Sequence, residues 1–400
     1  MIPTAEALSR ILSLVSPVTG TETVPLLEAA GRVLAAPATA RRTQPPFAAS
    51  AMDGYAVRDE GVSPGAEFTV IGESQAGLRF AGEVGPGQAV RIFTGAPVPT
   101  GADRVLIQED VERLDALGGD RIRARDNLDA GTHIRPAGGD FSQGDALSAP
   151  RRLTPRDISL LAAMNLAEVE VLRRPVVAIL ATGDELVEPG ETPGPDQIVS
   201  SNSYGLHALL AARGAAPRLA PIARDTMESL AAAFEAVADA DMVVTLGGAS
   251  VGDHDLVGRA AAEAGLSLDF WKVNMRPGKP LMAGRLPGGR PLLGLPGNPV
   301  SAMVCAQLFL LPAVDALSGL PGAAPRRLPA RLLEGVGPNG PREHFARARL
   351  EPGPEGLGVR VLGRQDSSLL SVLAEADALA VLPPGAPAMA AGETIEVIPL

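Results

Sequence analysis

A multidomain α/β protein is predicted, with a central three-layer domain over residues 173–322 and smaller units on both sides. After residue 173, buried strand patterns alternate with amphipathic helix patterns. Short β-type runs split by Gly and Pro fill residues 45–145, and helical pattern disappears after Pro321. Because 400 residues are too many for one ordinary core, several domains are expected.

The N-terminal part of the chain is predicted to be helical on both sides of an insertion. Thr4 can N-cap one helix, and a second short helix is expected over about residues 25–34. Thr154 and Pro155 have the N-cap and N1 chemistry that begins a further helix. The first helix has an apolar face, made of Ala7, Leu8, Ile11, Leu12 and Val15. We therefore assign residues 1–44 and 146–172 to a helical domain and residues 45–145 to an inserted β domain.

The central domain is predicted from its alternating pattern. Continuous apolar runs predict buried strands over 176–181, 219–222, 242–246, 268–273, 280–284 and 291–295. Amphipathic runs predict helices over 202–213, 226–238, 255–264 and 299–311. Such alternation is typical of a mostly parallel sheet covered by helices on both faces. Residues 323–400 are predicted to form a small C-terminal β domain.

Composition narrows the class of protein. The net charge of −11 argues against a general binder of nucleic acid or anionic membranes. The single cysteine, Cys305, excludes an internal disulfide, and its apolar helical setting favours a buried thiol. The first ten residues lack a signal-peptide pattern, and Pro312 is expected to break the apolar helix near 301–314. We therefore expect a soluble cytoplasmic protein.

Three glycine-containing loops carry most of the chemical information. Each follows a predicted buried strand, and ligands of parallel sheets bind at the carboxyl ends of strands. The first and third loops also lead into helices, whose free N–H groups attract anions. The loops span residues 247–255, 276–280 and 295–301. Side by side, they would suit a phosphorylated ligand with a divalent metal.

Charged side chains in these loops define the expected chemistry. Asp253 and Asp255 lie at one helix start, where one can cap the helix and the other is free for Mg²⁺. Arg276 and Lys279 flank a Pro-Gly turn that holds both cations, although a solvated loop is the alternative interpretation. Asn298 is expected to cap the helix after the third loop, and capping alone would also explain that loop.

Two further loops add carboxylates. Asp184 and Glu185 follow the first strand of the central domain, where they could hold a metal or accept ribose hydroxyls. Asp225 follows the second strand. Turn formation and ordinary loop preference are the simpler explanations for Asp184 and Asp225, and both interpretations remain open at this point.

Six segments together resemble one family, the molybdopterin molybdenumtransferases of the MoeA and gephyrin E-domain type. The resemblance covers essentially the whole chain, and the domain order agrees. It implies a central MoaB/Mog-like domain and a C-terminal β-barrel-like domain. The segments are residues 50–57, 91–103, 182–186, 247–255, 277–280 and 295–301.

The resemblance also implies an activity. Enzymes of this type take adenylylated molybdopterin and molybdate, cleave the phosphoanhydride with Mg²⁺, release AMP and insert the metal into the dithiolene. The resemblance further implies a homodimer. Its expected partners are the molybdopterin adenylyltransferase and downstream cofactor-handling proteins, with no nucleic acid and no membrane.

Motif positions imply individual roles. The expected metal ligands are Asp184, Glu185, Asp225 and Asp255. The expected catalytic residues are Asp53 and Thr94, both from the partner subunit, with Glu185, Asp225, Asp255 and Lys279. The expected substrate-binding residues are Thr182, Gly183, Gly247, Gly248, Ser250, Arg276, Pro296, Gly297, Asn298, Ser367 and Ser368.

Departures from the family pattern keep two alternatives in view. Arg276 stands where the family usually has Lys, and Gly139 stands where it usually has Glu. A non-catalytic molybdopterin-binding scaffold is therefore one alternative. The other is a molybdopterin adenylyltransferase, which shares the α/β domain but normally carries a Gly-Gly-Thr-Gly loop.

Overall fold

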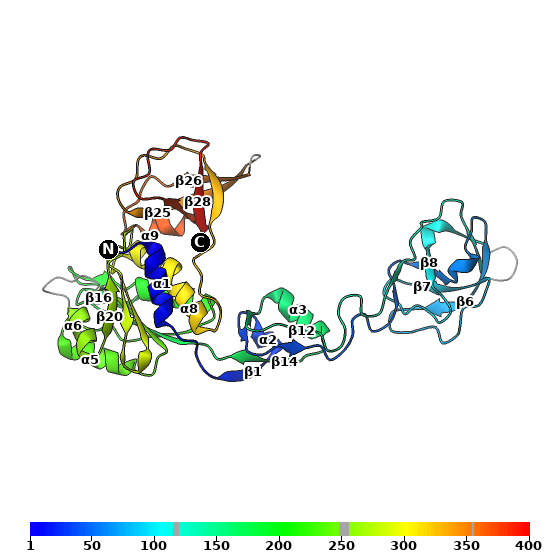
Figure 1. The fold of residues 1–400 in the computed structure, drawn as a ribbon, viewed down its shortest axis with the longest axis horizontal. Coiled ribbons are helices and arrows are strands. Elements are labelled where there is room, and N and C mark those ends of the chain that lie inside the picture. Colours follow the sequence, from blue (N-terminus) through cyan, green and yellow to red (C-terminus); the bar gives the residue numbers. More distant parts are fainter. Residues whose placement is uncertain (115–119, 248–255, 354–355) are drawn as a thin grey trace.

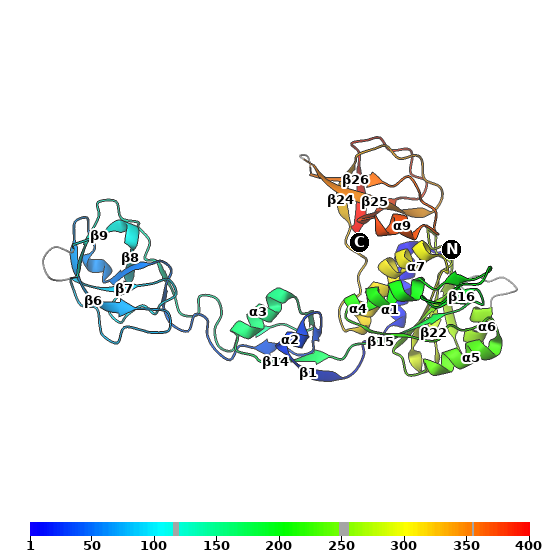
Figure 2. The ribbon, with the colours of Figure 1, turned by 180° about the vertical axis from the view of Figure 1, so that it is seen from behind.

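The molecule is elongated, with its units arranged along one long axis (Figures 1 and 2). The structure is a computed structural model of the 400-residue chain, and it describes residues 1–114, 120–247, 256–353 and 356–400. The α/β and C-terminal domains lie together at one end, and both termini lie there. The inserted β domain lies at the other end, with a small α+β unit between them.

The central domain is built on a six-stranded sheet. Its strand order is β18 (Ala216–Leu219), β15 (Val176–Ala181), β19 (Met242–Leu246), β23 (Pro291–Leu295), β22 (Met282–Arg285) and β20 (Ser267–Trp271). The first four strands pair in parallel, whereas β22 and β20 add in antiparallel fashion. The prediction of a mostly parallel sheet is confirmed. The second strand was expected over 219–222. Strand β18 instead covers Ala216–Leu219, so it starts three residues earlier and ends at the first expected residue.

Helices cover both faces of this sheet, so the domain has three layers. Strand β15 shows the division, since Val177 and Ile179 enter one core and Ala178 and Leu180 enter the other. The covering helices are α4 (Asn202–Ala212), α5 (Met227–Ala236), α6 (Leu256–Glu263), α7 (Pro299–Cys305) and α8 (Leu311–Leu317). Alternation of side chains along a strand thus places every second residue under a different helical layer.

The most apolar helix does not break at Pro312, so that prediction was wrong. Helix α7, the π-helical segment η4 (Ala306–Leu310) and α8 form one continuous helix in which Pro312 occupies the first turn of α8. By length and composition this 19-residue helix, Pro299–Leu317, could cross a membrane. However, 83% of its most apolar window is buried inside the structure, which is typical of a core helix.

The N-terminal unit is not a helical domain, which corrects the second part of the predicted fold. Helix α1 (Thr4–Leu14) packs instead on the central domain, against α8 and β22. Thr4 is its first residue and not its N-cap; its hydroxyl donates to Glu343.

The unit itself is a four-stranded sheet with two helices. The strand order is β1 (Thr21–Pro25), β14 (Glu168–Leu172), β2 (Val33–Leu34) and β13 (Arg151–Arg152), packed with α2 (Leu26–Ala29) and α3 (Pro155–Ala163). Thr154 does N-cap α3, in a capping box with Asp157.

The inserted domain is a six-stranded sheet. Its order is β8 (Arg104–Ile107), β5 (Gly54–Val57), β7 (Gln88–Ile92), β6 (Glu67–Ser74), β10 (Arg121–Ala124) and β9 (Val111–Arg113). Two short antiparallel pairs run between this domain and the four-stranded unit. They are β3 (Ala38–Thr39) with β12 (Ala146–Leu147), and β4 (Ala49–Ser50) with β11 (Ile134–Arg135).

The C-terminal domain is a closed five-stranded barrel. Its strands follow the order β25 (Glu343–Gly353), β26 (Gly356–Val361), β24 (Leu328–Leu332), β28 (Thr394–Pro399) and β27 (Ala378–Leu382), and β27 pairs again with β25. A short strand from the central domain, β21 (Met275–Arg276), pairs in parallel with the start of β25. Helix α9 (Leu370–Ala374) precedes β27.

Candidate functional site

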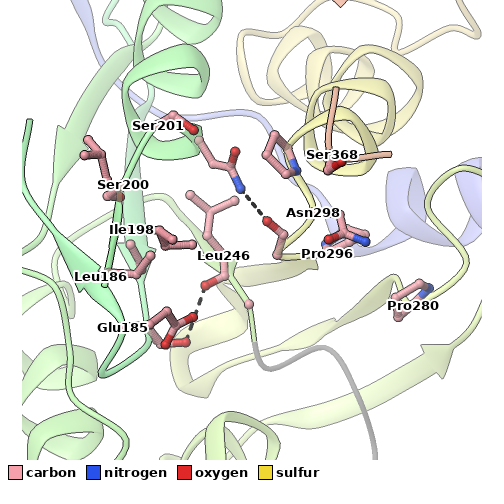
Figure 3. A pocket seen from close by; sticks show the side chains of 17 residues that line it. Glu185, Leu186, Ile198, Ser200, Ser201, Leu246, Pro280, Pro296, Asn298 and Ser368 are labelled. Carbon is pink, nitrogen blue, oxygen red and sulfur yellow. Dashed lines mark hydrogen bonds between the residues drawn. The ribbon is translucent and has the colours of Figure 1, made fainter. Parts of the chain in front are cut away.

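A cavity of about 590 Å³ opens where the central strands β15, β19 and β23 end (Figure 3). Its lining includes Glu185, Asn202 and Asn298 from the central domain and Ser368 from the C-terminal domain. The short parallel pair β16 (Leu186–Val187) and β17 (Ile198–Val199) forms one wall. The cavity therefore occupies the edge of the sheet where parallel α/β folds bind ligands.

Acidic side chains from two strand ends meet beside this cavity. Asp184 and Glu185 follow β15, and Asp225 lies beyond β18, where its backbone N–H donates to Asp184 Oδ1 at 3.2 Å. Arg224 holds the same turn, since its Nη1 donates to the carbonyl oxygen of Asp184 at 3.1 Å. The Asp184 carboxylate is thus bonded to the backbone of the loop that carries Asp225.

The neighbouring negative charges affect the pKa of Asp225. Partial burial, then the charges of Asp184 and Glu185, raise the pKa of Asp225 above its usual value. Within the described residues, no three His, Cys, Asp or Glu side chains are already close enough to hold a metal ion. A cation placed here would relieve the repulsion, and it would need further oxygen ligands from water or a substrate.

Glycines let the loops approach each other closely. A Cβ on Gly183, where φ is +148°, would lie 2.4 Å from a Glu185 carboxylate oxygen. Gly247 has φ of +88°, and a Cβ there would meet the Thr182 carbonyl oxygen at 3.2 Å. A Cβ on Gly297 would lie 3.6 Å from the Cα of Gly247. Gly247 and Gly297 therefore form a narrow part of the cavity lining, and Gly183 gives room to the Glu185 carboxylate.

Asn202 links the wall of the cavity to its floor. Its Nδ2 donates to the carbonyl oxygen of Gly297 at 2.7 Å. Its Oδ1 is buried and accepts no hydrogen bond from the described residues. An unpaired buried acceptor costs free energy, so Asn202 is prepared to accept a hydrogen bond from a ligand. The sequence analysis did not identify this residue.

The C-terminal domain reaches the cavity through Ser367 and Ser368. The backbone N–H of Val300, at the start of α7, donates to the Ser367 carbonyl oxygen at 3.0 Å. Asn298 takes the N-cap position of α7 but makes no capping hydrogen bond; its Nδ2 donates to Ser367 Oγ at 3.1 Å. Asn298 therefore joins two domains where capping was expected. Pro296 lines the same cavity.

The loop that carries Arg276 and Lys279 is folded tightly on the core. The Lys279 carbonyl oxygen accepts from the backbone N–H groups of Val273 at 3.0 Å and Leu281 at 3.1 Å. Both cationic side chains are exposed, and among the described residues neither has an ion-pair or hydrogen-bond partner. Pro280 lines the side of the cavity opposite Glu185 (Figure 3). The loop with the two cations therefore adjoins the cavity through Pro280, on the side away from Glu185.

Arg347 is a further cation near this site that the sequence analysis missed. It is only 1% exposed, and its Nη atoms donate to the carbonyl oxygens of Arg364 at 3.1 Å and Asp366 at 3.0 Å. Its Nε is buried without a partner among the described residues. Burial and the charge of Arg276 lower the pKa of Arg347, against an opposing effect of Asp366. The sequence did offer one signal: Arg347 lies two residues after Phe345 in a strand pattern, which places both side chains on the same face.

Asp53 and Thr94 lie elsewhere in the molecule, in the inserted domain. The backbone N–H and the Oγ1 of Thr94 both donate to Asp53 Oδ1 at 2.8 Å. These two hydrogen bonds lower the pKa of Asp53. One copy of the chain does not bring this pair to the cavity, because the inserted domain lies at the far end of the molecule (Figure 2). Gly248, Ser250 and Asp255 lie outside the described residues.

Comparisons with known proteins agree with this arrangement. Residues 2–165 match the family model for the MoeA N-terminal region (domain I and II), and residues 329–400 match that for the MoeA C-terminal region (domain IV). Residues 178–316 match the model for a probable molybdopterin binding domain. The fold and site thus define a multidomain protein of the MoeA class, with its cavity in the molybdopterin-binding domain.

Individual relatives span nearly the whole chain. A molybdopterin molybdenumtransferase of Nostoc is 38% identical over 95% of this chain and 89% of its own. That of Haemophilus influenzae is 34% identical over 100% and 98%. A crystal structure of the molybdopterin biosynthesis MoeA protein of Pyrococcus horikoshii matches with a TM-score of 0.83 at 28% identity, covering both chains completely. The chain belongs to the molybdopterin molybdenumtransferase family, whose members are transferases of molybdenum cofactor biosynthesis.

Proposed function

We propose that this chain inserts molybdate into adenylylated molybdopterin, cleaving the phosphoanhydride in a Mg²⁺-dependent reaction that releases AMP. Relatives named molybdopterin molybdenumtransferase support the substrate class. One structural observation carries the proposal: carboxylates gather beside a cavity at the strand ends, and Pro280, which follows Lys279 in the chain, lines the same cavity. Transfer of this kind needs positioning and charge neutralisation more than a covalent nucleophile.

The acidic side of the cavity fits a magnesium ion in its chemistry. Asp184, Glu185 and Asp225 offer the oxygen ligands that Mg²⁺ prefers, and we assign Asp255 to the same group. Mg²⁺ commonly uses one or two carboxylates and completes its shell with water and phosphate oxygens, so an incomplete protein cage is suitable. When bound, the ion would neutralise charge on the phosphoanhydride. The three described carboxylates would hold it, and Thr182 and Gly183 would shape the adjoining wall.

The basic side fits an oxyanion. Arg276 and Lys279 are exposed cations without protein partners among the described residues, and Arg347 lies behind Ser367 and Ser368 as a buried cation. In the proposed reaction Arg276 and Lys279 hold molybdate or phosphate, and the Ser367 hydroxyl donates a hydrogen bond to it. Ser368 lines the cavity beside it, with its hydroxyl donating to Asp366 Oδ1 at 2.6 Å. The substrate supplies its own sulfur ligands for the metal. Buried Cys305, whose thiol pKa is raised by burial, takes no part.

The wall formed by β17 fits a flat heterocycle. Ile198 is 59% exposed and Val199 42% exposed, although both are apolar and both line the cavity. Asn202 Oδ1 offers an unused acceptor on the same wall. We assign this wall to the pterin ring, whose N–H groups can pair with that acceptor. Gly247, Gly248, Ser250, Pro296, Gly297 and Asn298 would surround the rest of the substrate.

Asp53 and Thr94 complete the proposed site from a second copy of the chain. Their hydrogen bonds keep the Asp53 carboxylate ionised and fixed, which suits a catalytic group more than a loose surface residue. The nearby Arg91 is also held, since its guanidinium carbon lies 4.9 Å from the Tyr55 ring centre and 5.0 Å from that of Phe93. A homodimer would bring this group to the cavity of its partner. The molybdopterin adenylyltransferase, which supplies the substrate, and downstream cofactor-handling proteins are its expected partners.

The direct test is molybdate-dependent release of AMP. Purified protein is mixed with adenylylated molybdopterin and Mg²⁺, with and without molybdate, and AMP is measured over time. AMP release that requires both molybdate and Mg²⁺ is expected. Binding of the substrate without AMP release, under conditions where the Haemophilus influenzae relative turns over, would indicate a scaffold. Formation of the adenylylated substrate from ATP and molybdopterin would indicate the preceding enzyme in the pathway.

A further inference from the structure

Three basic side chains gather at the end of the C-terminal barrel. Arg276 of β21 pairs in register with His344 of β25, and neighbouring parallel strands place paired side chains on one face. Arg342 lies at a bend just before β25, two residues from His344, and its charge acts on His344. His344 is only 9% exposed, whereas Arg276 is exposed and Arg342 is half-buried. We call Arg276, Arg342 and His344 the basic triad.

Hydrogen bonds to main-chain carbonyl oxygens hold the segments that carry the three residues together. Asn274 Nδ2 donates to the carbonyl oxygen of Pro341 at 3.1 Å, and the Glu343 N–H donates to the Asn274 carbonyl oxygen at 3.2 Å. Asn339 Nδ2 donates to the carbonyl oxygens of Arg342 at 2.9 Å and Leu382 at 3.0 Å. The strand ends that carry the triad are therefore tied together before any ligand binds.

The triad has no acidic partner within the described part of the chain. Its three side chains form no ion pair or hydrogen bond there. The adjacent Glu343 is engaged by Thr4 and by Arg327, whose Nη2 lies 3.2 Å from Glu343 Oε1. Opposite His344 on β27 is the uncharged Leu382. Positive charges left together without a counter-ion favour an external anion.

The pKa of His344 agrees with this geometry. Burial, then the charges of Arg276, Arg347 and Arg342, lower the pKa of His344 to about 4, so its imidazole is neutral near pH 7. Arg276 of β21 is paired with His344, Arg342 lies at the bend before β25, and Arg347, three residues further along β25, lies on the other face of that strand. A dianion placed among them would cancel the repulsion and favour the imidazolium.

We propose that the basic triad is a binding subsite for a dianionic tetrahedral oxyanion, and that His344 takes up a proton from solvent when the anion binds. This inference rests on the proposed function, because Arg276 belongs to the side assigned there to molybdate or phosphate. His344 and Arg342 are its new members. The anion then meets two guanidinium groups and one imidazolium, while the empty site carries only the two guanidinium charges.

The proton linkage has a definite sign. Affinity rises as pH falls below the pKa of His344 in the complex, and it levels off below about pH 4, where the free imidazole is already protonated. If the anion restores the usual imidazole pKa of about 6.5, binding at pH 6 takes up more than roughly half a proton. At pH 8 the uptake falls nearly to zero.

Isothermal titration calorimetry on the full chain tests this proposal without any variant. Molybdate and AMP, which is a phosphate monoester, are titrated separately in two buffers of different ionisation enthalpy at pH 6 and pH 8. The heat difference between buffers gives the net number of protons taken up. The second phosphate pKa of AMP is about 6, so the protons that AMP itself releases at pH 6 are added back before His344 is assessed. Uptake with molybdate alone identifies molybdate as the ligand, and uptake with AMP alone identifies the phosphate ester. Binding of both without proton uptake at pH 6, or no binding of either, overturns the inference.

Variants then assign the proton. His344→Gln keeps a hydrogen-bond donor but cannot titrate, so it should bind at pH 8 like the unmodified chain and lose the gain at pH 6. His133→Gln, in the inserted domain, is the matched control and should keep that gain. A pH response retained in His344→Gln contradicts the assignment. Normal AMP release with pH-independent binding overturns this inference alone, whereas proton-linked binding without AMP release overturns the proposed function alone.

Discussion

At the scale of single residues, the site is defined by groups whose charges are left uncompensated. Partial burial and the charges of Asp184 and Glu185 raise the pKa of Asp225. Arg347 is buried, and its Nε has no hydrogen-bond partner among the described residues. Both arrangements cost free energy in the empty protein. Such costs are typical of functional sites, where a ligand of opposite charge provides the missing partner.

Asp225→Asn should therefore separate stability from activity. The raised pKa means that ionised Asp225 disfavours folding, and this penalty grows as pH rises through the pKa of the folded state. Removing the charge should increase thermal stability slightly, by less than about 1 kcal/mol after solvent screening, and the gain should vanish at acidic pH. AMP release should fall by about 10²-fold or more. Thermal melts at two pH values and single-turnover assays measure both effects, and a variant that is less stable at neutral pH would argue against the repulsion.

At the scale of elements, short loops between strands place the chemical groups. The loop after β21 is held by close packing, since a Cβ on Gly278 would lie 2.5 Å from Cys305 Sγ, and its φ is +104°. The same Sγ donates to the Gly278 carbonyl oxygen at 3.7 Å. The buried cysteine of α7 thus supports the loop that presents Arg276 and Lys279.

Gly278→Ala should disturb this loop. Backbone strain and overpacking should together cost about 1–4 kcal/mol in the free energy of unfolding and weaken molybdate binding. Adding Cys305→Ala should restore part of that loss, because it removes the clashing sulfur but not the strained φ. Chemical denaturation of the two single variants and the double variant gives the coupling energy. Strictly additive losses would show that Gly278 and Cys305 do not interact as described.

The elements also show what a sequence can and cannot predict. The central domain was predictable because its buried strands and amphipathic helices are local patterns, and β19 and β23 lie at the predicted residues. The sheet of the N-terminal unit was not, since its two-residue strands β2 and β13 pair residues more than 100 positions apart. Arg347 and Asn202 were missed for the same reason, because their burial and partners come from distant segments.

At the scale of the whole molecule, ion pairs attach the four-stranded unit to the central domain. Asp315 of α8 accepts from Arg152 Nη2 at 2.9 Å and from Arg213 Nε at 2.9 Å, joining that unit to the central domain. Arg173 pairs with Asp241 through two hydrogen bonds of 2.7 Å and also donates to the Thr19 carbonyl oxygen. These charged contacts hold the four-stranded unit against the central domain, and the inserted domain lies beyond that unit, away from the cavity (Figure 1). Under the proposed function, Asp53 would therefore serve the cavity of another copy.

Subunit complementation tests this shared site most directly. Asp53→Asn and Asp225→Asn each place one lesion on a different side of the proposed site, and each should be nearly inactive alone. Co-refolded or co-expressed together, they should form mixed dimers in which one site carries both lesions and the other carries none. The mixture should then recover about a quarter of the unmodified AMP-release rate. No recovery in a mixture proven to contain mixed dimers would contradict a site built from two subunits.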